Sequence, residues 1–112
     1  MLGYDAHVHE MRTDVPVEEL RRIAELPYEE RMSKLRALTS RRVAYVPYRT
    51  WVDHLLASSK DGRTQLLHDG GYPYVFYAIG AEIKANFAAY EAEGVAGLAD
   101  ATWYIVEAWD QS

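Results

Sequence analysis

The 112-residue chain contains no cysteine. It therefore cannot form a disulfide, a thiolate metal site or a cysteine nucleophile. It has no run of about 18 apolar residues, so we expect no membrane-spanning helix. It does not begin with a basic segment followed by an apolar one, so we expect no secretory signal. Together with the chain length, these absences predict a cytoplasmic protein with a single domain over residues 1–112.

Basic residues are scarce in the second half of the chain. Residues 1–59 balance nine Lys and Arg against nine Asp and Glu, whereas residues 60–112 have three basic side chains against eight acidic ones. The net charge of −5 therefore belongs to the second half. This distribution disfavours direct binding to nucleic acid, because phosphate contacts need Lys and Arg. It favours a basic protein partner, with a merely solubilising surface as the plainer interpretation.

Apolar residues recur at helical spacing along the first half of the chain. The spacing predicts one helix after Pro16, a second after Pro27 and a third over residues 48–56. Asp61-Gly62 is typical of a turn.

The clearest helical pattern lies over residues 73–93. It predicts a central helix with Phe76, Ile83 and Phe87 in the core, and with Gly94 at its C-terminal end. The expected fold is therefore all-α, with four to five helices around this central helix.

The last segment, residues 95–109, fits either of two structures. Its length and its apolar positions favour a helix, yet Thr102-Trp103-Tyr104-Ile105-Val106 is rich in residues that favour strands. The alternative is an α+β fold with short terminal strands, in which residues 2–9 pair with residues 102–109.

Asp5-Ala6-His7-Val8-His9 resembles the Asp-x-His-x-His signature of amidohydrolase barrels, in which the two histidines bind a catalytic metal. Such a barrel needs about 200–250 residues, and a catalytic metal normally has three protein ligands. We therefore expect no metal and no other cofactor. We favour a terminal strand on which both histidines point to the same side.

Other catalytic signatures are absent from the sequence. Ser58, His54 and Asp69 supply the residue types of a hydrolase, but no serine stands in a glycine-flanked nucleophile elbow. Gly70-Gly71 lacks the following Lys-Ser or Lys-Thr of a phosphate-binding loop. The sequence therefore predicts a protein that is not an enzyme.

Aromatic residues are plentiful, with nine tyrosines and three tryptophans. Tyr and Trp are favoured at protein interfaces because they combine a large apolar area with a polar tip, although core packing is the plainer role. The predicted partner-binding residues are the acidic and aromatic ones around the double glycine and the central helix: Asp69, Tyr72, Tyr74, Tyr77, Glu82, Glu91 and Glu93.

Asp69-Gly70-Gly71-Tyr72, Val75-Phe76-Tyr77 and the alanine-rich segment 88–99 resemble the DNA-mimic-protein-like domain family, over about residues 48–110. The resemblance implies a small, acidic, all-helical protein, often dimeric, that imitates DNA and occupies a DNA-binding regulator. Family members usually have Asn at the positions where Asp69 and Ala78 stand here.

The function expected from these features is that of a non-enzymatic, acidic binding module. It would occlude a basic partner, such as a DNA-binding protein or a nuclease, as a DNA mimic, an immunity protein or a phage-type inhibitor does. The alternative is a self-assembling structural subunit, for example a homodimer that buries Trp103, Trp109 and the tyrosines.

Overall fold

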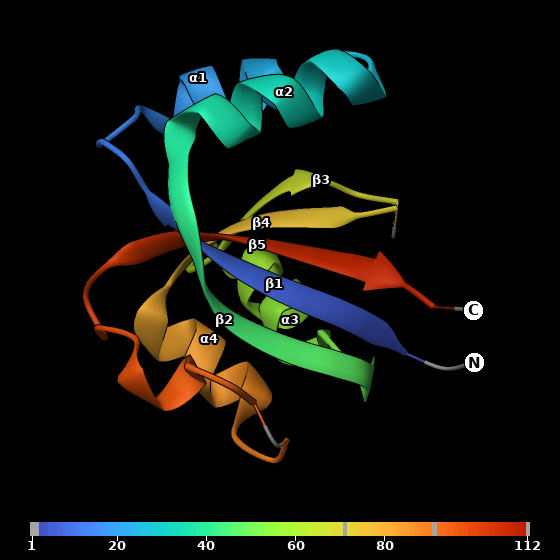
Figure 1. Ribbon diagram of the computed structural model, residues 1–112, viewed down its shortest axis with the longest axis vertical. Coiled ribbons are helices and arrows are strands. Elements are labelled where there is room, and N and C mark those ends of the chain that lie inside the picture. The colour runs from blue at the N-terminus through green and yellow to red at the C-terminus, as the bar shows by residue number, and fades with distance from the viewer. Residues whose placement is uncertain (1–2, 71, 91, 112) are drawn as a thin grey trace.

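The computed structural model describes residues 3–70, 72–90 and 92–111, and for Tyr48 and Arg49 it describes the backbone (Figure 1). Five antiparallel strands form one sheet in the order β2-β1-β5-β4-β3. The strands are β1 (Tyr4–Met11), β2 (Thr39–Thr50), β3 (Gln65–His68), β4 (Tyr74–Ile79) and β5 (Trp103–Asp110). The helices are α1 (Val17–Ala24), α2 (Tyr28–Leu38), α3 (Asp53–Lys60) and α4 (Gly80–Phe87), with a 3-10 turn, η1 (Val95–Gly97).

Helices cover both faces of the sheet. In Figure 1, α1 and α2 lie above the sheet, whereas α3 and α4 lie below it. Each pair of helices covers its own apolar cluster. The α1–α2 core consists of Leu20, Ile23, Leu35, Val75 and Ile105. The larger α3–α4 core includes Val8, Val46, Leu55, Phe76, Ile83, Phe87 and Val106. Within the described ranges, no helix is long and apolar enough to cross a membrane.

The prediction of an all-α fold is wrong. The segment 73–93, predicted as the central helix, divides into strand β4 and helix α4 at Gly80. The last segment forms strand β5 instead of a helix. The predicted helix over residues 48–56 is also misplaced, because β2 continues to Thr50 and α3 begins at Asp53.

Burial on both faces explains these errors. In β4, Phe76 faces the α3–α4 core, whereas its neighbour Val75 faces the α1–α2 core. A strand covered on both sides is apolar at consecutive positions, so it loses the alternation that distinguishes a strand from a helix.

Several other predictions are confirmed. Helices follow Pro16 and Pro27, and Gly62 has the positive φ of 82° that its turn requires. The core prediction is also confirmed, because Phe76, Ile83 and Phe87 have exposed fractions of 0%, 0% and 1%. The α+β alternative matches the pairing of the terminal segments, since β1 pairs with β5 from Tyr4 opposite Asp110 to Glu10 opposite Tyr104.

Gly94 has a role other than the predicted one. Its φ is +82°, but it stands before η1 and does not end the helix, since α4 stops at Phe87. A Cβ atom at Gly94 would lie 2.2 Å from the carbonyl oxygen of Val43 in β2. Glycine is therefore required both for the backbone conformation and for the close approach to the edge strand.

Candidate functional site

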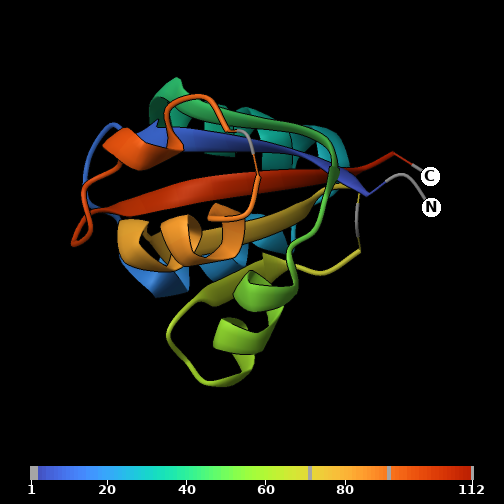
Figure 2. The same ribbon diagram turned by 90° about the horizontal axis from the view of Figure 1, so that it is seen from below.

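Four aromatic residues gather at the end of the sheet where β1 and β4 begin and β2 ends. The Tyr4 ring lies 6.2 Å from that of Trp51 and 5.7 Å from that of Tyr74. Tyr72 lies in the turn before Tyr74. Trp51 and Tyr72 are 36% and 60% exposed, a large fraction for aromatic side chains. Tyr4, Trp51, Tyr72 and Tyr74 are called the aromatic end below. Both chain termini emerge at this end of the molecule (Figures 1 and 2).

Two carboxylates, those of Asp110 and Asp53, act on Tyr4 at the aromatic end. The pKa of Tyr4 is raised, first by burial and then by neighbours that include Tyr74, Asp110 and Asp53. Asp69 is exposed and stands three residues before Tyr72 in the sequence. Exposed aromatic rings and acidic groups therefore lie together here.

The predicted partner-binding residues do not all lie together. Tyr72 and Tyr74 belong to the aromatic end, and Asp69 precedes them in the sequence. Tyr77 points to the other face of the sheet, where its ring stacks on Trp103. Glu91 lies outside the described residues.

The two remaining predicted residues have internal partners. Glu82 binds two side chains within the protein. Glu93 exchanges two backbone hydrogen bonds, of 2.9 and 3.0 Å, with Tyr45 on the outer side of β2. Tyr4 and Trp51, the other two members of the aromatic end, were not predicted as binding residues. Trp51 lies within residues 48–56, which were predicted as a helix.

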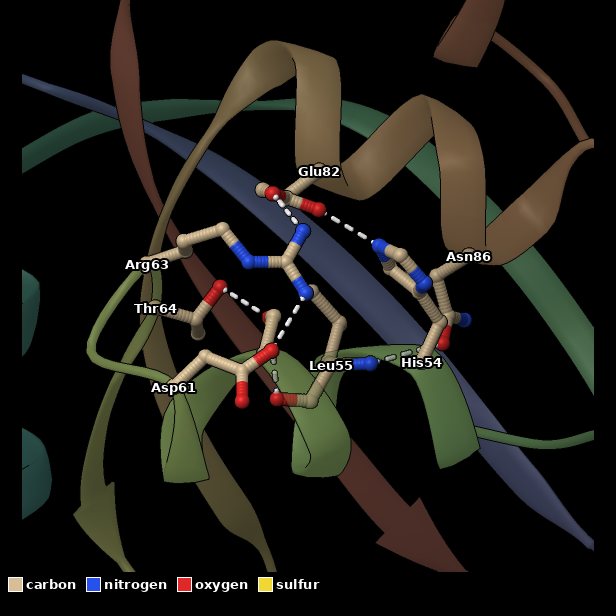
Figure 3. A network of polar contacts seen from close by, with 8 residues as sticks. His54, Leu55, Asp61, Arg63, Thr64, Glu82 and Asn86 are labelled. Atoms are coloured by element: carbon tan, nitrogen blue, oxygen red, sulfur yellow. Dashed lines mark hydrogen bonds and ion pairs between the residues drawn. The ribbon is translucent and has the colours of Figure 1, made fainter.

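The Glu82 carboxylate joins α4 to α3 and to the loop that follows α3 (Figure 3). His54 Nε2 lies 2.5 Å from Glu82 Oε2, and Arg63 donates to Oε1 over 2.6 Å. Arg63 also binds Asp61 over 2.8 Å. The pKa of Glu82 is lowered, first by the hydrogen bond with His54 and also by Arg63, against the effect of burial. The network cross-links secondary-structure elements, and every charged member already has a partner.

Asn86, also drawn in Figure 3, connects α4 to the aromatic end. Its Oδ1 accepts a hydrogen bond of 3.1 Å from the backbone N–H of Leu55, and its Nδ2 donates one of 2.9 Å to the carbonyl of Trp51. Asn86 is 9% exposed. It therefore fixes the backbone that presents Trp51 to solvent.

A second polar cluster occupies the sheet on the α1–α2 side, and we call it the histidine face: Asp5, His7, His9, Arg36, Arg42, Tyr45 and Glu107. His7 and His9 point to the same side of β1, as predicted, with ring centroids 6.5 Å apart. A register shift between Val8 and His9 places Arg42 opposite His9.

Glu107 is the buried charge at the centre of the histidine face. Its side chain is 1% exposed, and Arg36 binds both of its oxygens, over 2.6 and 2.9 Å. His9 Nε2 lies 3.6 Å from Oε1, which is an ion-pair distance and not a hydrogen bond. Burial raises the pKa of Glu107, but His9 and Arg36 outweigh burial and lower that pKa to about 2. This pair clamps α2 onto the central strand β5.

The surroundings of His7 favour its neutral form. Its Nδ1 lies 3.1 Å from Arg42 Nη1, and since Arg can only donate, Nδ1 must accept. Burial and then Arg42 lower the pKa of His7. Burial and then Asp5 raise the pKa of Tyr45, which lies opposite His7 on β2. In the described ranges, no three His, Asp or Glu side chains form a group that could hold a metal ion.

Glu107 was not identified from the sequence. The available signal was a lone acidic residue inside the apolar segment 103–109, together with the basic run that contains Arg36. A buried carboxylate of this kind needs a cationic partner.

Comparison with known proteins gives no relative: no family model, no curated protein and no solved structure matches the chain. The resemblance to the DNA-mimic-protein-like family thus rests on the quoted motifs alone, and the all-helical fold that it implied is not the fold of this chain.

Proposed function

We propose that the protein is a non-enzymatic binding protein whose aromatic end docks against a basic segment of another protein. The observation that carries this proposal is the exposure of Trp51 and Tyr72, together with the Asp110 and Asp53 carboxylates that act on Tyr4 and the exposed Asp69 three residues before Tyr72. Buried Trp and Tyr anchors supply much of the binding energy at protein interfaces.

The chemistry of the aromatic end suits Lys and Arg side chains. A cation is attracted to the face of a Trp or Tyr ring, and nearby carboxylates add to that attraction. Carboxylates at the rim also accelerate the encounter with a basic partner. DNA mimics, immunity proteins and phage-type inhibitors all share this mode of occluding a basic surface.

Titration with an arginine-rich peptide tests the proposal. We expect the peptide to quench Trp51 fluorescence and to shift the NMR signals of Tyr4 and Tyr72, with an affinity that falls as salt rises. Trp51→Ala and Asp69→Lys should each weaken binding about tenfold, the effect of about 1.4 kcal/mol.

Glu25→Lys is the matched control for the charge change, because Glu25 is exposed at the end of α1. It should change the affinity less than about twofold, the usual effect of a peripheral charge. Equal losses in Asp69→Lys and Glu25→Lys would mean that only net charge matters, and would refute docking at the aromatic end.

The alternative function is self-assembly. β2 is an edge strand of 12 residues, and such an edge can pair with another chain. The exposed Arg41 and Arg42, and the backbone of Glu93 bonded to Tyr45, oppose edge pairing. A second copy would therefore use the aromatic end. A molecular mass that doubles with concentration, and that Trp51→Ala returns to that of one chain, would favour this alternative.

A further inference from the structure

A groove opens at the end of the sheet opposite the aromatic end. It lies between the segment that follows β1 and the segment that precedes β5, and it has a volume of about 490 Å³. This volume is in the range of sites for small molecules. Its lining includes Met11, Arg12, Asp14, Tyr77, Thr102 and Trp103.

Two aromatic rings form the rigid part of the groove. Tyr77 and Trp103 are stacked, with centroids 4.9 Å apart and planes inclined by 24°. Tyr77 also packs against the α1–α2 core. Both residues belong to the paired strands β4 and β5, where Ile79 lies opposite Trp103 and Tyr77 lies opposite Ile105. The rings are therefore in place before a ligand arrives.

The rim of the groove offers both donors and acceptors. Asp14 and Thr102 are exposed. Burial and then the charge of Asp14 raise the pKa of Tyr77, so its hydroxyl keeps its proton. Arg12 uses Nη2 to bind the carbonyl of Thr39 over 3.3 Å, which leaves other guanidinium N–H groups. Glu10 also lines the groove, so two acidic side chains and the basic Arg12 surround it, and an anionic ligand is disfavoured.

We propose that this groove binds a ring that carries adjacent hydroxyl groups, either a free saccharide or the ribose of a nucleoside. Adjacent hydroxyls can donate to the Asp14 carboxylate and accept from the Arg12 guanidinium at the same time. The C–H face of such a ring fits against an aromatic ring, whose face carries partial negative charge. The site is independent of the aromatic end.

NMR titration of the full chain tests this inference with four probes: methyl α-D-glucopyranoside, methyl β-D-ribofuranoside, adenosine and 2′,3′-dideoxyadenosine. Tetramethylammonium, a cation without hydroxyl groups, is the control for attraction by the aromatic rings alone. We expect saturable shifts of the Trp103 indole and Thr102 signals at millimolar concentration. A response to the glucoside indicates a free saccharide as the ligand. A response to the riboside and adenosine, but not to dideoxyadenosine, indicates a nucleoside ribose.

Asp14→Asn should weaken the binding about tenfold, because a neutral amide accepts weaker hydrogen bonds than a carboxylate. Glu18→Gln on α1 is the control, since Glu18 is also exposed and does not line the groove. Thermal unfolding of both variants checks that each is folded. The inference is overturned if no probe shifts Trp103, if tetramethylammonium alone binds, or if neither glycoside binds while adenosine and dideoxyadenosine bind equally.

Discussion

Replacing Arg36 by Met tests the clamp between α2 and the central strand. Met retains an unbranched apolar side chain and a helix propensity close to that of Arg, so the change mainly removes the guanidinium. Glu107 then keeps a carboxylate that is 1% exposed and has lost two hydrogen bonds of 2.6 and 2.9 Å.

Two independent arguments give the size of the effect. Removing one partner of a buried ion pair costs about 3–5 kcal/mol. The pKa of Glu107 falls from its usual 4.5 to about 2, and this difference corresponds to about 3 kcal/mol of stability at neutral pH. Because His9 supplies part of that shift, we expect Arg36→Met to lower the free energy of unfolding by about 3 kcal/mol.

The opposite change, Glu107→Gln, should cost less. The Arg36 side chain is 49% exposed and can be hydrated when its partner is neutral. We therefore expect a loss of only about 1–2 kcal/mol, typical of one buried group with imperfect partners. Arg36→Met should therefore lower the free energy of unfolding more than Glu107→Gln does.

The pH dependence has a definite sign. Between pH 4.5 and about 2 the unfolded Glu107 binds a proton and the folded one does not. Its contribution is therefore complete above pH 4.5 and is lost as the pH falls towards 2. Glu107→Gln should remove this part of the dependence of the free energy of unfolding on pH.

Urea unfolding, followed by far-UV circular dichroism at pH 7, 4 and 3, measures both effects. The double variant completes a cycle that isolates the coupling between the two residues. A loss below about 0.5 kcal/mol in Arg36→Met would place it among ordinary surface substitutions and refute the clamp.

Two further predictions concern loops and helix contacts. Gly94→Ala should destabilise the protein by at least about 1–3 kcal/mol through backbone strain alone, because φ is +82°. The new Cβ atom would also meet the edge strand. Gly97→Ala, where a Cβ atom meets nothing within 4 Å, is the control in the same urea assay. Glu82→Gln should lower the melting temperature because it weakens the contacts of α4 with both His54 and Arg63. Glu18→Gln on α1 should leave the melting temperature unchanged. Equal melting temperatures for the two variants would show that the network in Figure 3 contributes nothing measurable.

Local patterns identified the first two helices, because α1 and α2 each cover only one face of the sheet. The spacing of Leu20 and Ile23 follows from that one-sided burial. β4 and β5 lie inside the sheet with helices on both faces, so their composition resembles that of a buried helix. Their identity depends on partners far away in the sequence, such as Val8 opposite Val106.

The candidate sites depend on the fold in the same way. Asp69, Tyr72 and Tyr74 were found because they are neighbours in the sequence. Trp51 joins them only because β2 ends beside the start of β1 and β4, and the groove exists only because residues 11–14 and 101–103 meet. No local pattern contains that information.

The strand order has a consequence for how the chain folds. β1 with β2 and β3 with β4 form two halves of the sheet, and the last strand, β5, is inserted between them (Figure 2). Until β5 arrives, the halves share no strand pairing, and β1 and β4 each present an open inner edge. Contacts between distant segments slow folding, and open edges invite aggregation. We therefore expect the sheet to close in a single late step, and chains that stop short of β5 to aggregate rather than to form a smaller stable domain.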